Sequence, residues 1–141
     1  MKLRITILDD DADICNFLKS ALDSKGHDVT TLTDPTDFPF LDEKNCPCPP
    51  GKPCADILIA DNVMPNIEGI DFFKKLGEHN CQTMLKNNVA IMSGYLTIHY
   101  INELNKMGIH YFRKPFELSE VYEWVEECEA RIKASQAPAS D

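Results

Sequence analysis

The stretch ADILIADNVMPNIEG, residues 55–69, contains the apolar run ILIA, which ends at Asp61. The segment 55–61 that carries this run has the length and the Ile content of a strand buried on both faces. Residues 67–79 follow with Ile70, Phe73 and Leu76 at helical spacing, so this segment predicts an amphipathic helix. A buried strand leading into such a helix is the repeating unit of an α/β fold.

The same alternation continues on both sides of this stretch. Strands are predicted at 3–8, 27–32, 55–61, 88–93 and 109–114. Helices are predicted around 14–22, at 67–79, at 97–108 with Ile98, Ile101 and Leu104 buried, and at 118–133. Residues 34–44 form a poor helix because Pro39 interrupts them. Five such units predict a doubly wound parallel sheet with helices on both faces.

Composition narrows the classes of function. The net charge is −9, the sequence pI is about 4.8 and no basic cluster is visible, which argues against direct nucleic-acid binding. No apolar run approaches the roughly 20 residues that span a bilayer. The N-terminus MKLRITILDD turns acidic too soon for a signal peptide. We therefore expect a cytoplasmic protein with no membrane partner.

Polar residues gather where the predicted strands end. Asp9 and Asp10 follow the first strand and Asp61 ends the third, whereas Ser93 and Lys114 end the fourth and fifth. The carboxyl ends of parallel strands form the edge at which ligands bind. Clustered carboxylates favour a bound cation, and Mg²⁺ prefers oxygen ligands. A carboxylate can also act as nucleophile toward a phosphoryl group, whose charge Mg²⁺, an ammonium and a hydroxyl would stabilise.

Four segments in chain order, ILDDD, LIADNVMPNIEG, AIMSG and YFRKPF, resemble the response-regulator receiver domains of two-component signalling, of the chemotaxis-receiver kind. The resemblance covers residues 2 to about 133. It implies a flavodoxin-like sheet of strand order 2-1-3-4-5. It also implies a signalling receiver in a phosphorelay, which assists its own phosphorylation and dephosphorylation and is not otherwise an enzyme.

The resemblance assigns roles to matching positions. Asp61 would be the phosphoacceptor, supplied by a sensor histidine kinase or a phosphotransfer protein. Mg²⁺ or Mn²⁺ would be held by Asp9, Asp10, Asp61 and the backbone carbonyl of Val63. Ser93 and Lys114 would contact the phosphoryl group, Tyr111 would be the switch aromatic, and the bond before Pro115 would be cis. A downstream protein would bind the face made by helix 97–108, strand 109–114 and helix 118–133.

Three other functions stay open on the sequence. The chain could be a binding module that does not depend on phosphorylation, although its acidic, hydroxyl and lysine set is complete. It could be a phosphatase with an aspartate nucleophile, but the residue two past Asp61 is Val63 and not a second acid. It could also be a metal- or redox-responsive module that uses its cysteines.

The cysteines concentrate in NCPCPPGKPCAD, residues 45–56. We predict a receiver domain over 1–134 with a Cys/Pro-rich insert at 45–54, and a disordered tail at 135–141. The insert enters the strand at 55–61 from the end opposite Asp61, and Cys81 reaches the same edge. Cys46, Cys48, Cys54 and Cys81 could bind structural Zn²⁺, form a disulfide from Cys54 to Cys46 or Cys48, or remain free thiols in a stiff loop. Cys15 and Cys128 fall on buried helix faces.

Overall fold

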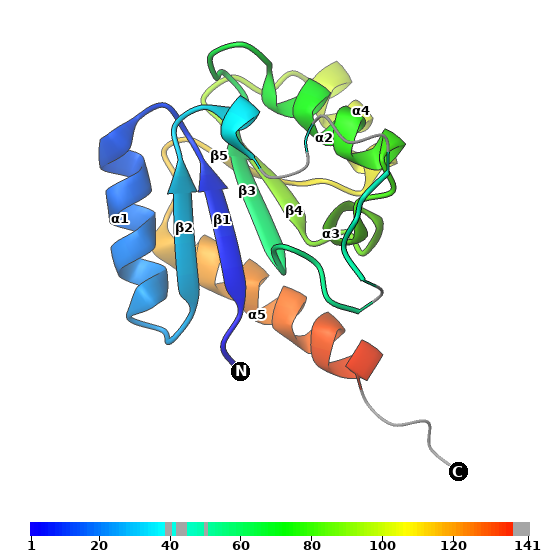
Figure 1. Cartoon of the computed structure of the whole chain (residues 1–141). Helices are drawn as coiled ribbons and strands as arrows, with labels where there is room; N and C mark the ends of the chain where they lie inside the picture. Colours follow the sequence, from blue (N-terminus) through cyan, green and yellow to red (C-terminus); the bar gives the residue numbers. More distant parts are fainter. Residues whose placement is uncertain (39–40, 42–44, 50, 137–141) are drawn as a thin grey trace.

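The protein is described by a computed structural model that covers residues 1–38, 41, 45–49 and 51–136 (Figure 1). Its sheet contains β1 (Arg4–Leu8), β2 (Asp28–Leu32), β3 (Ile57–Asp61), β4 (Val89–Ser93) and β5 (His110–Arg113). The strands are all parallel and lie in the order β2-β1-β3-β4-β5. The predicted fold class and strand order are therefore confirmed.

Helices cover both faces of this sheet. They are α1 (Ala12–Asp23), α2 (Gly69–Glu78), α3 (Gln82–Leu85), α4 (Ile98–Met107) and α5 (Leu118–Gln136), with a 3-10 turn η1 at Pro35–Asp37. The core residues divide into two clusters, one on each face: α1 and α5 pack on one face, and η1, α2, α3 and α4 pack on the other (Figure 1). No helix among the described residues is both long enough and apolar enough to cross a bilayer.

The helix termini follow from local chemistry. The Asp11 carboxylate accepts hydrogen bonds from the backbone N–H groups of Asp13 and Ile14 and so starts α1. The Thr97 hydroxyl accepts from the backbone N–H of Tyr100 and starts α4. These caps fix the points at which the chain leaves the carboxyl edge of the sheet.

One expectation about α4 needs revision, whereas the poor helix expected between β2 and β3 agrees with the described residues. Ile98 was predicted to be buried, but it is the first residue of α4 and its side chain is 79% exposed. Of the three predicted core residues of this helix, Leu104 is fully buried and Ile101 is half-buried. The segment 34–44 contributes only η1 to the described structure, and Pro39 lies outside the described residues.

The helices also differ from prediction at two places. The short helix α3 was not predicted, because its four residues are too few to show a periodic pattern. Helix α5 reaches Gln136 and takes in the first two residues of the predicted tail, while 137–141 lie outside the described residues.

Candidate functional site

The register of the sheet brings the predicted site residues together. Leu8 pairs with Ala60, so Asp9 and Asp61 leave neighbouring strands at the same level. On the other side, Asp61 pairs with Met92, which places Ser93 next along β4. The backbone N–H of Lys114 donates to the Ser93 carbonyl at 2.8 Å and sets the end of β5 beside β4.

Three carboxylates meet at this edge. One carboxylate oxygen from each of Asp9, Asp10 and Asp61 lies within 4.8 Å of the others, and no other group of acidic, thiol or imidazole ligands in the described residues is so compact. Asp9 and Asp61 are buried, and Asp10 is exposed to solvent. This donor set of oxygens, open to water on one side, fits a hard divalent cation such as Mg²⁺.

The Lys114 ammonium bridges two of the carboxylates. Its Nζ donates to Oδ1 of Asp61 at 2.9 Å and to Oδ2 of Asp9 at 3.2 Å. Asp9 is further oriented by the backbone N–H of Asp11, which donates to its Oδ1 at 2.9 Å. The carboxylates therefore face a fixed cationic group from the fifth strand, which offsets part of their mutual repulsion.

Burial and neighbouring charges shift the pKa values of Asp9 and Lys114. Burial raises the pKa of Asp9, and the neighbouring Asp61 charge adds to that rise against the opposing Asp11 hydrogen bond and Lys114 charge. Burial alone would lower the pKa of Lys114, but its hydrogen bonds and charge interactions with Asp61 and Asp9 outweigh burial and raise it. The lysine therefore stays charged beside the aspartates at neutral pH.

Ser93 is buried and occupied by local hydrogen bonds. Its hydroxyl donates to the Tyr95 carbonyl at 3.0 Å and accepts from the Tyr95 backbone N–H at 3.1 Å. The Tyr95 side chain itself is 80% exposed. The Ser93 hydroxyl thus lies at the carboxyl edge of the sheet with the aspartates, but it would have to give up these two hydrogen bonds to contact a ligand.

The remaining predicted positions surround this edge. The Val63 side chain is 70% exposed, two residues past Asp61. Tyr111 is half-buried and packs against the core cluster that contains Leu104. The peptide bond between Lys114 and Pro115 is cis.

Tyr100 makes a contact near the site that no sequence pattern indicated. Its hydroxyl, on α4, donates to Oδ1 of Asn62, the residue immediately after Asp61. Burial raises the pKa of Tyr100, so the phenol keeps its proton and remains a donor. This bond ties α4 directly to the loop that leaves β3. No sequence pattern marks it, because the partners are 38 residues apart.

Removing this bond tests how much it contributes. In Tyr100→Phe, we expect the free energy of unfolding to fall by about 0.5–1.5 kcal/mol, since Asn62 loses its partner. Tyr95→Phe is the matched control, because its exposed ring should change stability by less than about 0.5 kcal/mol. Urea unfolding measures both. Equal stability of the two variants would contradict a role for the Tyr100–Asn62 bond.

The predicted cysteine site lies away from this edge. All six cysteines are free thiols in the described structure. Cys15 and Cys128 are buried in the core, as predicted. Cys46, Cys48 and Cys54 are half-buried in the segment before β3, and Cys81 is buried between α2 and α3.

A five-stranded parallel sheet with a lysine-bridged acidic group at its carboxyl edge defines the class of signalling receiver domains. Comparison with known proteins agrees. A family model described as the response regulator receiver domain matches residues 5–126. The chain therefore belongs to the response regulator receiver domain family, whose members are signalling modules of two-component systems.

Individual relatives share the fold over nearly the whole chain. The receiver domain of the Francisella response regulator 1452 is 26% identical, with a TM-score of 0.74 over 95% of this chain and 99% of that one. A response regulator receiver domain protein from Clostridium thermocellum is 21% identical, with a TM-score of 0.73 over 94% and 98% of the two chains, which shows the fold alone.

A curated full-length relative is also similar. The nisin biosynthesis regulatory protein NisR of Lactococcus lactis subsp. lactis is 28% identical over 96% of this chain. The chain spans about half the length of that relative, 53%. The similarity therefore covers a receiver-sized part of that regulator.

Proposed function

We propose that this receiver accepts a phosphoryl group on Asp61 from a histidine kinase or phosphotransfer protein, and that the modification changes a protein-binding surface. The observation that carries the proposal is the pairing of Lys114 Nζ with Asp61 at 2.9 Å and with Asp9 at 3.2 Å. A lysine that spans the acceptor and an adjacent carboxylate suits a site in which negative charge increases during reaction.

In the proposed transfer, a carboxylate oxygen of Asp61 attacks the phosphorus of a phosphohistidine. The P–O bond to Asp61 forms as the P–N bond breaks, and the electron pair of the broken bond stays on the imidazole, which takes up a proton. Lys114 would then pair with one phosphoryl oxygen. The Ser93 hydroxyl would give up its hydrogen bond to the Tyr95 carbonyl and donate to a second phosphoryl oxygen instead.

The acidic group would hold Mg²⁺ or Mn²⁺ through Asp9, Asp10, Asp61 and the Val63 carbonyl. The donor set supports this assignment, because three carboxylate oxygens lie within 4.8 Å of one another. When bound, the cation neutralises charge on the phosphoryl oxygens. Asp9 is held for this purpose by the Asp11 backbone N–H.

The readout we propose runs through α4 and β5. Movement of Ser93 toward the phosphoryl group would release the backbone of Tyr95, which precedes α4, and Tyr111 on β5 would follow. A local change in charge can alter a distant surface when it favours one of two packing arrangements of a helix or strand. The face formed by α4, β5 and α5 would then bind a downstream protein.

The direct test is labelling by a small phosphodonor. We expect acetyl phosphate with Mg²⁺ to add one phosphoryl group per chain, in a base-labile acyl phosphate that peptide mapping assigns to Asp61. Omitting the divalent cation, or adding excess chelator, should abolish labelling. A native, folded protein that takes no label under these conditions, or takes it at another residue, would show that the proposal is wrong.

A further inference from the structure

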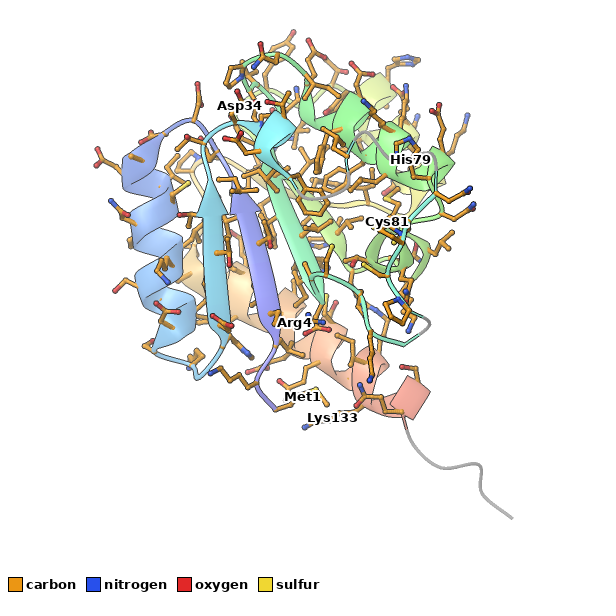
Figure 2. All side chains as sticks on the ribbon, viewed as in Figure 1. Met1, Arg4, Asp34, His79, Cys81 and Lys133 are labelled. Carbon is orange, nitrogen blue, oxygen red and sulfur yellow. The ribbon has the colours of Figure 1, made fainter. Side chains whose placement is uncertain are left out.

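The cysteine-rich segment is hydrogen-bonded to the connection between α2 and α3. The backbone N–H of Cys46 donates to the His79 carbonyl at 2.7 Å. The Gln82 side chain donates to the Cys48 carbonyl at 3.0 Å and to that of the next residue, and accepts from the Gly51 backbone N–H at 3.0 Å. The two segments, about 30 residues apart, therefore follow a shared path, and Figure 2 shows His79 and Cys81 along it.

The end of the segment is fixed as it enters β3. The Asp56 carboxylate accepts from the Arg4 backbone N–H at 2.9 Å, and the Thr83 hydroxyl donates to the Ala55 carbonyl. Cys54 and Cys81 belong to the same hydrophobic cluster. The thiols therefore collect near the amino end of β3, at the opposite end of that strand from Asp61.

Four sulfur atoms gather in this region. Cys54 lies within electrostatic range of all three other thiols, those of Cys46, Cys48 and Cys81. The Cys48 thiol lies near those of Cys46 and Cys54, and the Cys81 thiol lies near that of Cys46. An open cavity of about 380 Å³ beside Cys46 and Cys48 is also lined by Lys86. Cys46 and Cys48 are thus reachable from solvent, and a cationic side chain borders them.

The fold brings these four cysteines to one place through contacts of the backbone and the core. Cys46 is joined to the α2–α3 connection by its backbone N–H, and Cys54 and Cys81 share one hydrophobic cluster. Crowded thiolates repel one another and become favourable when a cation sits among them.

A further polar atom nearby has no partner. Nδ1 of His79 is buried and makes no hydrogen bond to the part of the chain that the structure describes. His79 is two residues before Cys81 and is joined to Cys46 through its backbone carbonyl. Buried polar atoms without partners are rare, and an ion or its ligands is one explanation for them.

We propose that Cys46, Cys48, Cys54 and Cys81 form a thiolate site for Zn²⁺, with His79 as a neighbouring hydrogen-bond partner for a ligating sulfur. Four thiolates in tetrahedral geometry are a usual structural zinc set. Binding replaces four S–H bonds by four Zn–S bonds and releases four protons to solvent. No three of these sulfurs lie within 4.8 Å of one another in the described structure, so binding would require the four cysteines to move closer together.

The site would stabilise the connection between β2 and β3, whose described residues contain only the three-residue η1 turn. Because metal binding to folded ligands contributes to folding free energy, zinc would fasten this connection to α3 and thereby hold the start of β3.

The test measures metal in the native protein, purified reduced and without chelator. We expect about one zinc per chain, and less than about a tenth of that in Cys54→Ser and in Cys81→Ser. Cys128→Ala is the control, since that thiol lies in the core on α5, and it should retain the metal. Zinc that persists in both serine variants would overturn the proposal, as would native protein that binds none when Zn²⁺ is added.

A second measurement does not depend on variants that fold. Metal-stripped native protein is treated with a thiol-alkylating reagent, with and without added Zn²⁺, and the modified cysteines are mapped by mass spectrometry. We expect zinc to slow alkylation of the four cysteines at least tenfold and to raise the melting temperature. Unchanged alkylation, or a disulfide among these cysteines in the native protein, would overturn the proposal. Neither measurement involves phosphorylation, so the result is independent of the role of Asp61.

Discussion

Asp61→Asn should fold like the native protein and take up no phosphoryl group from acetyl phosphate. The amide removes the nucleophilic carboxylate while keeping nearly the same shape, and loss of a covalent nucleophile costs several orders of magnitude in rate. Lys114 keeps its ion pair with Asp9, so the edge of the sheet retains one of its two bridges. We expect at least about a thousandfold less labelling.

Asp28→Asn is the matched control for this change. Asp28 is an exposed residue at the amino end of β2, away from the carboxyl edge, and the substitution is chemically identical. It should be labelled at the native rate. Phosphate incorporation is followed by intact mass, and circular dichroism checks that the fold is kept. Labelling of Asp61→Asn at the native rate would show that another group is the acceptor.

Gly69→Ala should disturb both stability and phosphorylation. A Cβ at this first residue of α2 would lie 2.6 Å from the Asp61 carbonyl oxygen and 3.1 Å from Cα of Asn62. Both are backbone atoms, and the Gly69 N–H donates to the Asn62 carbonyl at 2.8 Å, so α2 cannot simply move away. We expect the free energy of unfolding to fall by about 1–3 kcal/mol. The displaced acceptor loop should also slow labelling by acetyl phosphate.

Gly77→Ala gives the matched control within the same helix. A Cβ there would meet only Cγ of Met84, at 3.9 Å, which is an ordinary contact. Alanine is the better helix former, so this variant should gain about 0.5–1 kcal/mol and be labelled normally. Chemical denaturation and the labelling rate separate the two variants. If Gly69→Ala were as stable and as active as Gly77→Ala, the close approach of α2 to the Asp61 loop would have no functional importance.

Most of the fold was predictable because each unit of it is local. The Ile-rich run before Asp61 predicts a strand buried on both sides, and this is what β3 is. The helix predicted at 118–133 is α5, whose inward face buries Val121, Trp124 and Cys128. Ile98 was misplaced because periodicity gives the face of a helix but not which residues at its ends are covered by the rest of the fold.

The candidate site was predictable in its residue types but not in its contacts. Strand ends identified the aspartates, Ser93 and Lys114, since parallel strands bring their carboxyl ends to one edge. That Lys114 bridges Asp61 and Asp9, and that Ser93 is engaged by Tyr95, depends on side-chain placement. The Tyr100–Asn62 bond depends on how α4 packs and has no sequence signal.

The sequence by itself thus determined the strand and helix alternation, the acidic edge and its family resemblance, because these follow from periodicity and chain order. Only the tertiary structure decided which distant groups touch. It brought Gly69 against the Asp61 carbonyl and joined the Cys46 segment to His79. The physical reason is that such contacts are fixed by strand register and by helix packing, which act between segments far apart along the chain.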